Sequence, residues 1–249
     1  MKISVITATY NREKTVVRAI ESVKNQTYLD IELVVVDGAS KDATISLIEP
    51  LIGENDICVS EKDDGLYDAL NKGISLATGA VVGFLHSDDM YVNTSVLEKV
   101  ASMFLDQSID VVYGDACFFR EGNTQKVVRY YRSDELSVKN LAWGKMPAHT
   151  AMFFRKNVYE TYGLFKTTYH ICADYEFLCR IVTQARLKSV RLPEPLVKMQ
   201  IGGVSTGGLR STIILNKEVL KACADNEIYT NILMVLSKYP SKILQFIKL

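Results

Sequence analysis

Residues 31–40 read IELVVVDGAS, and this stretch decides the fold class of the chain. Ile31–Asp37 is nearly continuous in apolar, β-branched residues, which is typical of a strand covered on both faces. A β-rich run, Lys2–Ala8, precedes it, and Thr15–Lys24 between the two places apolar side chains at helical spacing. A strand, a helix and a second buried strand in this order predict parallel neighbours joined by a crossover helix.

The same alternation continues to about residue 113. Ser95, with Glu98 three residues later, predicts a capping box at the start of one of these helices. Together the elements predict an α/β fold with a mostly parallel central sheet flanked by helices. The predicted helices are Thr44–Leu51, Leu66–Ala77 and Ser95–Leu105, and the predicted strands are Ile57–Ser60, Ala80–Leu85 and Ile109–Tyr113.

The second half of the chain is less regular. Two strands within Tyr113–Tyr131 are predicted to meet at a hairpin turn over residues 121–123. The further expected elements are a strand over Ala151–Phe154, a helix from Asp174 to about Gln184, a glycine-rich loop over Ile201–Gly208, and a helical remainder broken at Pro240.

Composition excludes several classes of protein. The chain has 249 residues, 48% of them apolar, and 29 basic against 29 acidic side chains. This apolar content excludes intrinsic disorder, and zero net charge argues against a nucleic-acid binder. No stretch approaches the roughly 20 apolar residues of a membrane-spanning helix. The five cysteines form no Cys-x-x-Cys pair, which predicts reduced thiols in a cytoplasmic protein.

Polar residues follow the predicted strands, where ligands gather in sheets of this type. The clusters are Thr7–Arg12, Asp37–Ser40 and His86–Asp89, and we expect them to converge on one cleft. Asp88 and Asp89 are adjacent carboxylates that suit Mg²⁺ or Mn²⁺; the alternative is a solvated turn that caps the next helix. Asp37 can accept hydrogen bonds from a base or ribose, or it can belong to a simple Asp-Gly turn.

Two further residues are candidates for chemistry. Asp174 lies at a predicted helix start, where the macrodipole favours an ionised carboxylate, so it is a candidate general base or simply a helix cap. Glu176 is its rival, although only one of the two should face the cleft. His149 can hold a phosphate, a metal or an acceptor hydroxyl, or it can be structural.

The motifs as a set resemble the family 2 glycosyltransferases, which have the nucleotide-sugar-binding GT-A (Rossmann-like) fold. The resemblance covers about residues 1–210 and is greatest to the branch that includes colanic-acid and O-antigen glycosyltransferases. It is carried by residues 4–12 (SVITATYNR), 26–28 (QTY), 35–42 (VVDGASKD), 63–74 (DDGLYDALNKGI), 77–79 (ATG), 84–89 (FLHSDD), 146–155 (MPAHTAMFFR), 173–176 (ADYE) and 202–205 (GGVS).

The resemblance implies a role for each matching residue. Asp88 and Asp89 would hold the cation, and Asp174 would take the place of the catalytic base. His86 and Ala173 depart from the family pattern, because acidic residues are common at both positions. The residues implied to bind the nucleotide sugar are Thr7, Thr9, Tyr10 and Arg12 around the nucleotide, Asp37 at the base, Asp64 and Lys72 near the ribose and sugar phosphate, with Asp88 and His149.

The implied activity is an inverting, Mn²⁺- or Mg²⁺-dependent transfer from a nucleoside-diphosphate sugar, expected to be UDP-linked. The acceptor would be a saccharide or a polyprenyl-diphosphate-linked saccharide in surface polysaccharide biosynthesis. Residues 1–113 would form the nucleotide-binding half, 114–210 the acceptor and catalytic half, and 211–249 a C-terminal helical extension. A non-catalytic sugar-nucleotide-binding module and a nucleotidyltransferase are the alternatives.

The end of the chain suggests how the acceptor could be reached. After Ser237 its charges are Lys238, Lys242 and Lys248, interleaved with apolar residues. A short basic amphipathic helix of this kind can lie on the inner face of the cell membrane, as a peripheral contact. The alternative is packing against its own domain or against a partner in a homo-oligomer.

Overall fold

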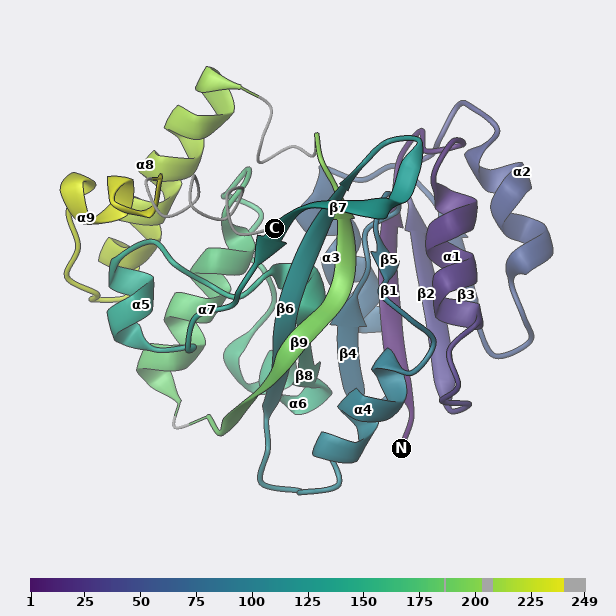
Figure 1. The fold of residues 1–249 in the computed structure, drawn as a ribbon, viewed down its shortest axis with the longest axis horizontal. Helices are drawn as coiled ribbons and strands as arrows, with labels where there is room; N and C mark the ends of the chain where they lie inside the picture. The colour runs from purple at the N-terminus through teal and green to yellow at the C-terminus, as the bar shows by residue number, and fades with distance from the viewer. Residues whose placement is uncertain (186, 203–207, 240–249) are drawn as a thin grey trace.

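A nine-stranded sheet forms the centre of the computed structural model, which describes residues 1–185, 187–202 and 208–239. The strand order is β3-β2-β1-β4-β8-β6-β9-β5, with β7 paired to β6 (Figure 1). The strands are β1 Ile3–Thr9, β2 Ile31–Asp37, β3 Ile57–Ser60, β4 Val81–Phe84, β5 Met90–Tyr91, β6 Val111–Arg120, β7 Asn123–Tyr131, β8 Met152–Arg155 and β9 Ser189–Gln200.

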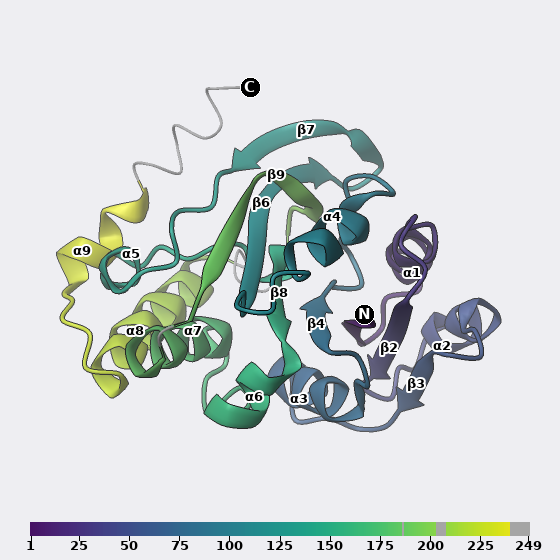
Figure 2. The same ribbon diagram turned by 90° about the horizontal axis from the view of Figure 1, so that it is seen from below.

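Helices cover both faces of this sheet. Viewed from below, α1 and α4 lie on one side of the strands, and α3 and α6 lie on the other (Figure 2). The α-helices are α1 Val16–Lys24, α2 Thr44–Ile48, α3 Leu66–Leu76, α4 Val96–Met103, α5 Val138–Ala142, α6 Lys156–Tyr162, α7 Ala173–Gln184, α8 Leu209–Asp225 and α9 Ile232–Leu236, and short 3₁₀ turns cover Glu49–Leu51 and His149–Ala151.

Alternation along the strands builds two hydrophobic cores. On β1, Ile3 and Val5 face the core that α1, α2 and α4 cover, whereas Ile6 and Ala8 face the core under α3, α6 and α7. Successive side chains of a strand point to opposite faces, so a strand that is buried on both faces must be apolar throughout. This is the reason that the continuous apolar run Ile31–Asp37 forms a central strand.

The predicted fold class is confirmed. Strands β1, β2, β3 and β4 pair in parallel, and β1 and β2 are in register so that Thr9 lies opposite Asp37. The predicted hairpin also forms, because β6 and β7 pair antiparallel, and Gly122 between them has a φ of +80°, which glycine adopts without strain. The strands added after β4 are mixed: β8 runs antiparallel to β4 and β6, while β9 runs parallel to β6.

Two details of the sequence-based prediction were wrong or missing. Ser95 makes no capping bond to the helix; its amide and hydroxyl bond to Asn93, and Glu98 accepts from Thr27, so no capping box forms. Strand β9 was not predicted, because Pro193 and Pro195 lack the N–H that a strand normally donates.

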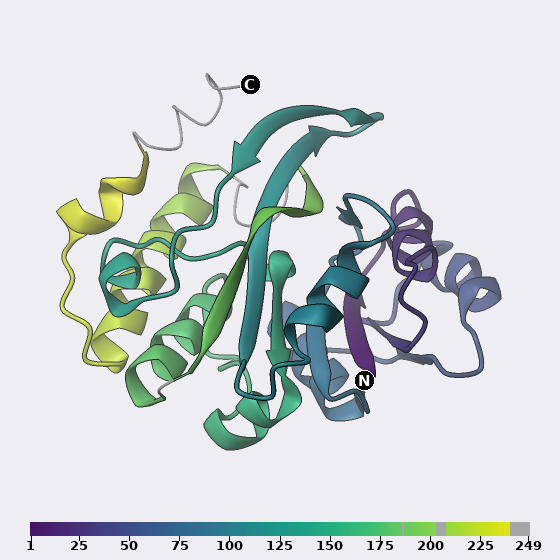
Figure 3. The ribbon, with the colours of Figure 1, turned by 60° about the horizontal axis from the view of Figure 1, so that its bottom comes forward.

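The β6–β7 hairpin and the C-terminal helices complete the structure. The hairpin reaches over towards α1, and α5, α7, α8 and α9 gather beyond β6 and β9 (Figure 3). Helix α8 packs Val219, Ala222 and Cys223 into the same core as α3 and α7. Within the described residues, no helix is both long and apolar enough to cross a membrane. Most of the basic tail and the centre of the glycine-rich loop, 203–207, lie outside the described residues.

A candidate active site at the carboxyl ends of the strands

Side-chain hydrogen bonds join the loop after β1 to the loop after β2. Asn11, which has a φ of +51°, donates its amide to Ser40 Oγ (2.8 Å) and accepts from the amide of Lys41 at Oδ1 (2.8 Å). The amide of Arg12 donates to Thr44 Oγ1 (2.7 Å). Because each loop satisfies the backbone of the other, the first two predicted clusters do form one surface.

Asp37 anchors this surface from below. Its carboxylate is fully buried and accepts from the Ser40 amide (2.8 Å), the Ser40 hydroxyl and the Ser60 hydroxyl (2.7 Å). Thr7 is also fully buried, and its place in the nucleotide pocket stays a prediction. Thr9 is 5% exposed, and the hydroxyls of both threonines lack a hydrogen-bond partner in the described structure. Base contact by Asp37 stays a prediction, and its observed contacts make it an anchor for residue 40.

Asp63 lies beside the surface predicted to bind the nucleotide. A Cβ added to Gly38 would lie 2.5 Å from Asp63 Oδ2 and 3.4 Å from the Tyr10 ring, so these three residues are close neighbours. Tyr10 is half exposed and open to a ligand. Asp64 is exposed, and its amide donates to Asp68 Oδ2 (3.1 Å) on α3. A contact of Asp64 with the ribose stays a prediction, and Asp63 is a neighbouring candidate that the sequence analysis did not name.

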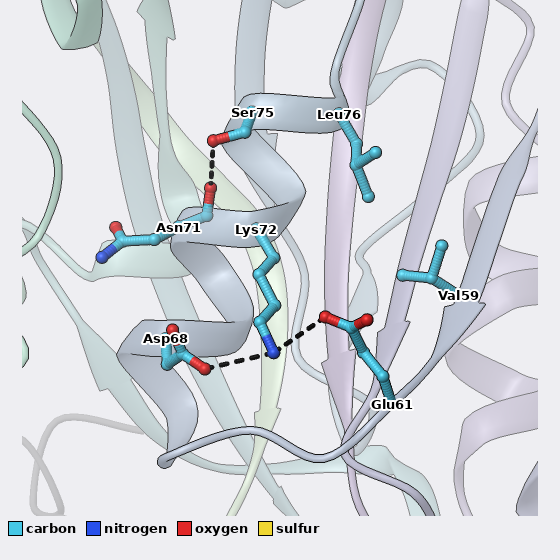
Figure 4. Close-up of a pocket in the computed structure, with 7 residues that line it drawn as sticks. All are labelled: Val59, Glu61, Asp68, Asn71, Lys72, Ser75 and Leu76. Carbon is cyan, nitrogen blue, oxygen red and sulfur yellow. Dashed lines mark hydrogen bonds and ion pairs between the residues drawn. The ribbon is translucent and has the colours of Figure 1, made fainter.

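Lys72 lies outside the surface formed by Tyr10 and Gly38. Its ammonium group pairs with Glu61 (2.9 Å) and Asp68 (3.2 Å) and donates to the Lys62 carbonyl (2.9 Å). The pairs with Glu61 and Asp68 raise the pKa of Lys72, and the bonds to Glu61 and Lys62 fasten the loop that carries Asp63. Figure 4 shows the ion pairs at the mouth of a separate open pocket between α3 and β3, of about 390 Å³. A direct contact of Lys72 with the sugar phosphate stays a prediction.

Arg12, which the resemblance places at the nucleotide, and Asp88, which it places at the cation, line one pocket of about 470 Å³. The loop before α1 forms one wall, and Gln200–Gly202 at the end of β9 and Glu121 of the hairpin form the other. Gly202 comes from the predicted glycine-rich loop and has a φ of +115°. The pocket therefore joins residues from distant parts of the chain at the ends of β1, β4 and β9.

Asp89 lies beneath this pocket. Arg18 holds the two residues beside it, Asp88 and Gln200. Asp89 is 3% exposed; one carboxylate oxygen accepts from the Gln200 amide (3.1 Å), and Oδ2 has no hydrogen-bond partner in the described structure. Burial and the charge of Asp88 raise its pKa well above the usual range. Arg18 donates to the Asp88 carbonyl (2.7 Å) and to Gln200 Oε1 (2.9 Å). Arg18 is a site residue that no motif revealed, since it lies in the middle of a helix.

A divalent cation fits this arrangement. No group of three or more histidine, cysteine or acidic side chains that could hold a metal occurs in the described parts of the chain. Mg²⁺ and Mn²⁺, however, commonly use only one or two carboxylates together with substrate phosphates and water. Asp88 faces the pocket, and the unpartnered Oδ2 of Asp89 is a buried carboxylate oxygen that a cation would stabilise.

His149 packs into an aromatic cluster beside the site. Its ring stacks on Phe84 (4.7 Å between centroids), meets Phe165 edge-on (5.5 Å), and lies 6.1 Å from the ring of His86. Burial lowers the pKa of His149 to about 3, so the imidazole is neutral at physiological pH. Its Nε2 is buried without a partner in the described structure, and a role in binding the nucleotide sugar stays a prediction.

Asp174 lies in the first turn of α7, half-buried against α3. Its Oδ1 accepts from the Tyr67 hydroxyl (3.0 Å) and from the Tyr175 amide (2.8 Å). Burial raises the pKa of Asp174 to about 6, and these two hydrogen bonds oppose the rise. From the sequence we expect the helix dipole to favour the ionised form, and loss of solvation outweighs that effect on the pKa of Asp174.

Glu218 and Glu176 fix the start of α7. Glu218 on α8 accepts from three successive backbone amides, those of His170 (2.7 Å), Ile171 (2.9 Å) and Cys172 (2.9 Å). Glu176, the rival candidate base, is fully buried and paired with Lys166 (2.7 Å) and Arg180 (3.1 Å). Asp174 is therefore the acidic residue of this turn with a carboxylate that is partly open.

Comparison with known proteins identifies the family. A model of the glycosyl transferase family 2 matches residues 4–163. The chain belongs to glycosyltransferase family 2. This family 2 glycosyltransferase is 30% identical over 222 residues to the PGL/p-HBAD biosynthesis glycosyltransferase of Mycobacterium bovis, covering 88% of this chain and 82% of that protein. It is 29% identical over 218 residues to an uncharacterized glycosyltransferase of Nostoc, covering 82% and 66% of the two chains.

Solved structures agree on the fold of this glycosyltransferase. TarS 1–349 of S. aureus in complex with UDP-GlcNAc superposes with a TM-score of 0.68 at 18% identity, over 89% of this chain and 66% of that one. The mannosyltransferase PcManGT of Pyrobaculum calidifontis, in complex with GDP-Man and Mn²⁺, superposes with a TM-score of 0.66 at 19% identity. The match covers 92% of this chain and 65% of that one. The chain spans only 40% of a longer TarS structure. Family membership favours the predicted glycosyltransferase over the nucleotidyltransferase alternative.

Proposed function

We propose that this glycosyltransferase moves a sugar from a nucleoside diphosphate to a saccharide hydroxyl with inversion, using Asp174 as general base. One observation supports this proposal most strongly. Asp174 is a half-buried carboxylate with a pKa of about 6, and Tyr67 holds one of its oxygens in place. A base whose pKa lies near the working pH is well matched to proton transfer.

The donor would bind across the ends of β1, β2 and β4. Tyr10 and Asp63 would face the nucleoside. Arg12, in the pocket that it shares with Asp88, would contact the diphosphate. Asp88 and Asp89 would hold Mn²⁺ or Mg²⁺, which, when bound, neutralises the charge that builds up on the leaving diphosphate. The UDP-GlcNAc bound to TarS and the GDP-Man bound to PcManGT support a sugar nucleotide, and we propose the UDP-linked class.

The acceptor hydroxyl would approach Asp174 from the side of α7. As its oxygen attacks the anomeric carbon, the proton passes to the Asp174 carboxylate and the bond to the diphosphate breaks on the opposite face. An α-linked donor would therefore give a β-linked product. General-base assistance of this kind contributes roughly 10²–10⁴ to the rate, and positioning of the two substrates adds to it.

The acceptor class comes from the family resemblance. We propose a saccharide, free or linked to a polyprenyl diphosphate, in the synthesis of a surface polysaccharide. The relative from M. bovis is named a PGL/p-HBAD biosynthesis glycosyltransferase, which supports a role in a biosynthetic pathway. Contact of the basic tail with the inner face of the membrane remains part of this proposal. Flotation with anionic liposomes, with and without residues 240–249, tests it.

A matched pair of variants tests the function. The protein is screened with Mn²⁺ against a panel of nucleotide sugars for thermal stabilisation, and the hit is assayed for transfer and for slow hydrolysis. Asp174→Asn should keep donor binding and lose most turnover, whereas Asp88→Ala should lose Mn²⁺-dependent UDP binding in titration calorimetry. Turnover close to wild type in Asp174→Asn would refute the base assignment. A protein that binds donors but never turns them over would be the non-catalytic module instead.

A further inference from the structure

We propose that Tyr67 is a positioning residue for the general base, and that its hydroxyl proton turns between two acceptors as Asp174 gains and loses a proton. The inference rests on the function proposed above, because it concerns the base of that reaction. Tyr67 belongs to the first turn of α3, more than a hundred residues from Asp174 along the chain.

The geometry around the hydroxyl is unusual. The Tyr67 oxygen lies 2.5 Å from the carbonyl oxygen of Ile171 and 3.0 Å from Asp174 Oδ1. A phenol has one proton, so it can make one full hydrogen bond to these two acceptors at any moment. The ring itself is buried and packed against Phe165 (5.7 Å between centroids), which leaves rotation of the O–H as the available motion.

The second acceptor is held as firmly as the first. The Cys172 amide, which shares a planar peptide group with the Ile171 carbonyl, donates to Glu218 on α8 (2.9 Å), so the peptide that presents this carbonyl to Tyr67 is fixed from the other side. Asp174 Oδ1 also receives the Tyr175 amide (2.8 Å). Among the hydrogen bonds of the described residues, none uses Asp174 Oδ2, which is therefore the oxygen open to an acceptor hydroxyl.

These contacts define two states of the base. While Asp174 is ionised, Tyr67 donates to Oδ1 and stabilises the charge. When the acceptor O–H bond breaks and its proton reaches Oδ2, Oδ1 becomes a weaker acceptor, and the Tyr67 proton turns to the Ile171 carbonyl. Tyr67 keeps its own proton throughout, since burial and the nearby Asp174 raise its pKa well above the usual range. The hydroxyl thus stays satisfied before and after transfer.

Other titratable groups face Asp174 without taking this role. Tyr131 on β7 donates to the Met146 carbonyl (2.6 Å), and Glu218 is turned to the backbone amides before α7. Cys172 lies beside Glu218, and its pKa is raised mainly by burial. Within the described structure, Tyr67 is the side chain that donates a hydrogen bond to Asp174.

The test measures the Asp174 pKa directly, with no substrate present. Carboxyl ¹³C NMR titrations are recorded on the full chain, and the Asp174 resonance is assigned with Asp174→Asn. Tyr67→Phe should raise this pKa by about one pH unit, which is the low end of what a hydrogen bond to a charged group is worth. Tyr159→Phe is the matched control, because its hydroxyl is buried in the same aromatic cluster but has no partner in the described structure.

A second substitution guards against a folding defect. Replacing Tyr67 with 3-fluorotyrosine keeps the shape, strengthens the donor, and should move the Asp174 pKa downwards. The acidic limb of UDP release from UDP-GlcNAc with Mn²⁺ should move with the NMR value in each variant. An unchanged Asp174 pKa in both Tyr67 variants, or an acidic limb that fails to follow it, would overturn the inference. Full turnover by Asp174→Asn would instead mark a failure of the proposed function.

Discussion

Glu218→Ala removes the carboxylate that holds the backbone before α7, and we expect it to destabilise the fold. The carboxylate accepts from the amides of His170, Ile171 and Cys172, and the alanine would leave all three without that acceptor. An unpaired buried donor costs about 1–3 kcal/mol. His170 is exposed, so water can replace the carboxylate there, but Cys172 is buried and Ile171 half-buried. We expect the free energy of unfolding to fall by about 3 kcal/mol.

Urea denaturation measures this loss, with the shift of the midpoint read at an unchanged slope. Glu160→Ala is the control, since Glu160 is exposed on α6 and should change stability by less than about 0.5 kcal/mol. Glu218→Gln should fall between the two, because its amide oxygen accepts but its NH₂ group faces an amide donor. A loss below about 1 kcal/mol in Glu218→Ala would show that the three hydrogen bonds do not hold the start of α7.

Three further predictions concern the site and its loops. Asp63→Ala should weaken UDP binding in calorimetry and Asp64→Ala should not; equal effects would contradict the placement of these neighbours. Turnover should rise with pH through about 6 and level off above it, because the base Asp174 must be ionised; a flat profile between pH 5 and 7 would argue against that pKa. Ala39→Gly should stabilise the fold by roughly 0.5 kcal/mol in thermal unfolding, since Ala39 has a φ of +60°. Ala43→Gly, at a φ of −75°, should destabilise it.

The sequence predicts the first half of the fold because each strand carries its own signal. Ile31–Asp37 is apolar throughout, and its partner β1 ends at the matching polar residue, so the convergence of their loops follows from parallel register. Strand β9 carries the opposite signal, since two prolines interrupt it, and only pairing with β6 makes it a strand. The Gln200 amide that holds Asp89 could not be predicted without that strand.

Within the site, the sequence predicts which loops matter more reliably than which side chains face the ligand. Asp63 and Asp64 are chemically equal neighbours, and sequence alone could not show that Asp63 lies beside Gly38. The acidity of Asp174 depends on burial by residues distant in sequence, so a local rule about helix starts could not give it.

The bonds that join residues 11–13 to residues 40–44 have a consequence for engineering. Each loop supplies acceptors to the other's amides, including Asp42 to Glu13 and Glu13 to Ala43, so neither segment has a self-sufficient conformation. A chimera that borrows only one of them from another transferase would inherit unmatched polar groups. Exchange of nucleotide preference between relatives should therefore require transplanting both segments together, as a single cassette.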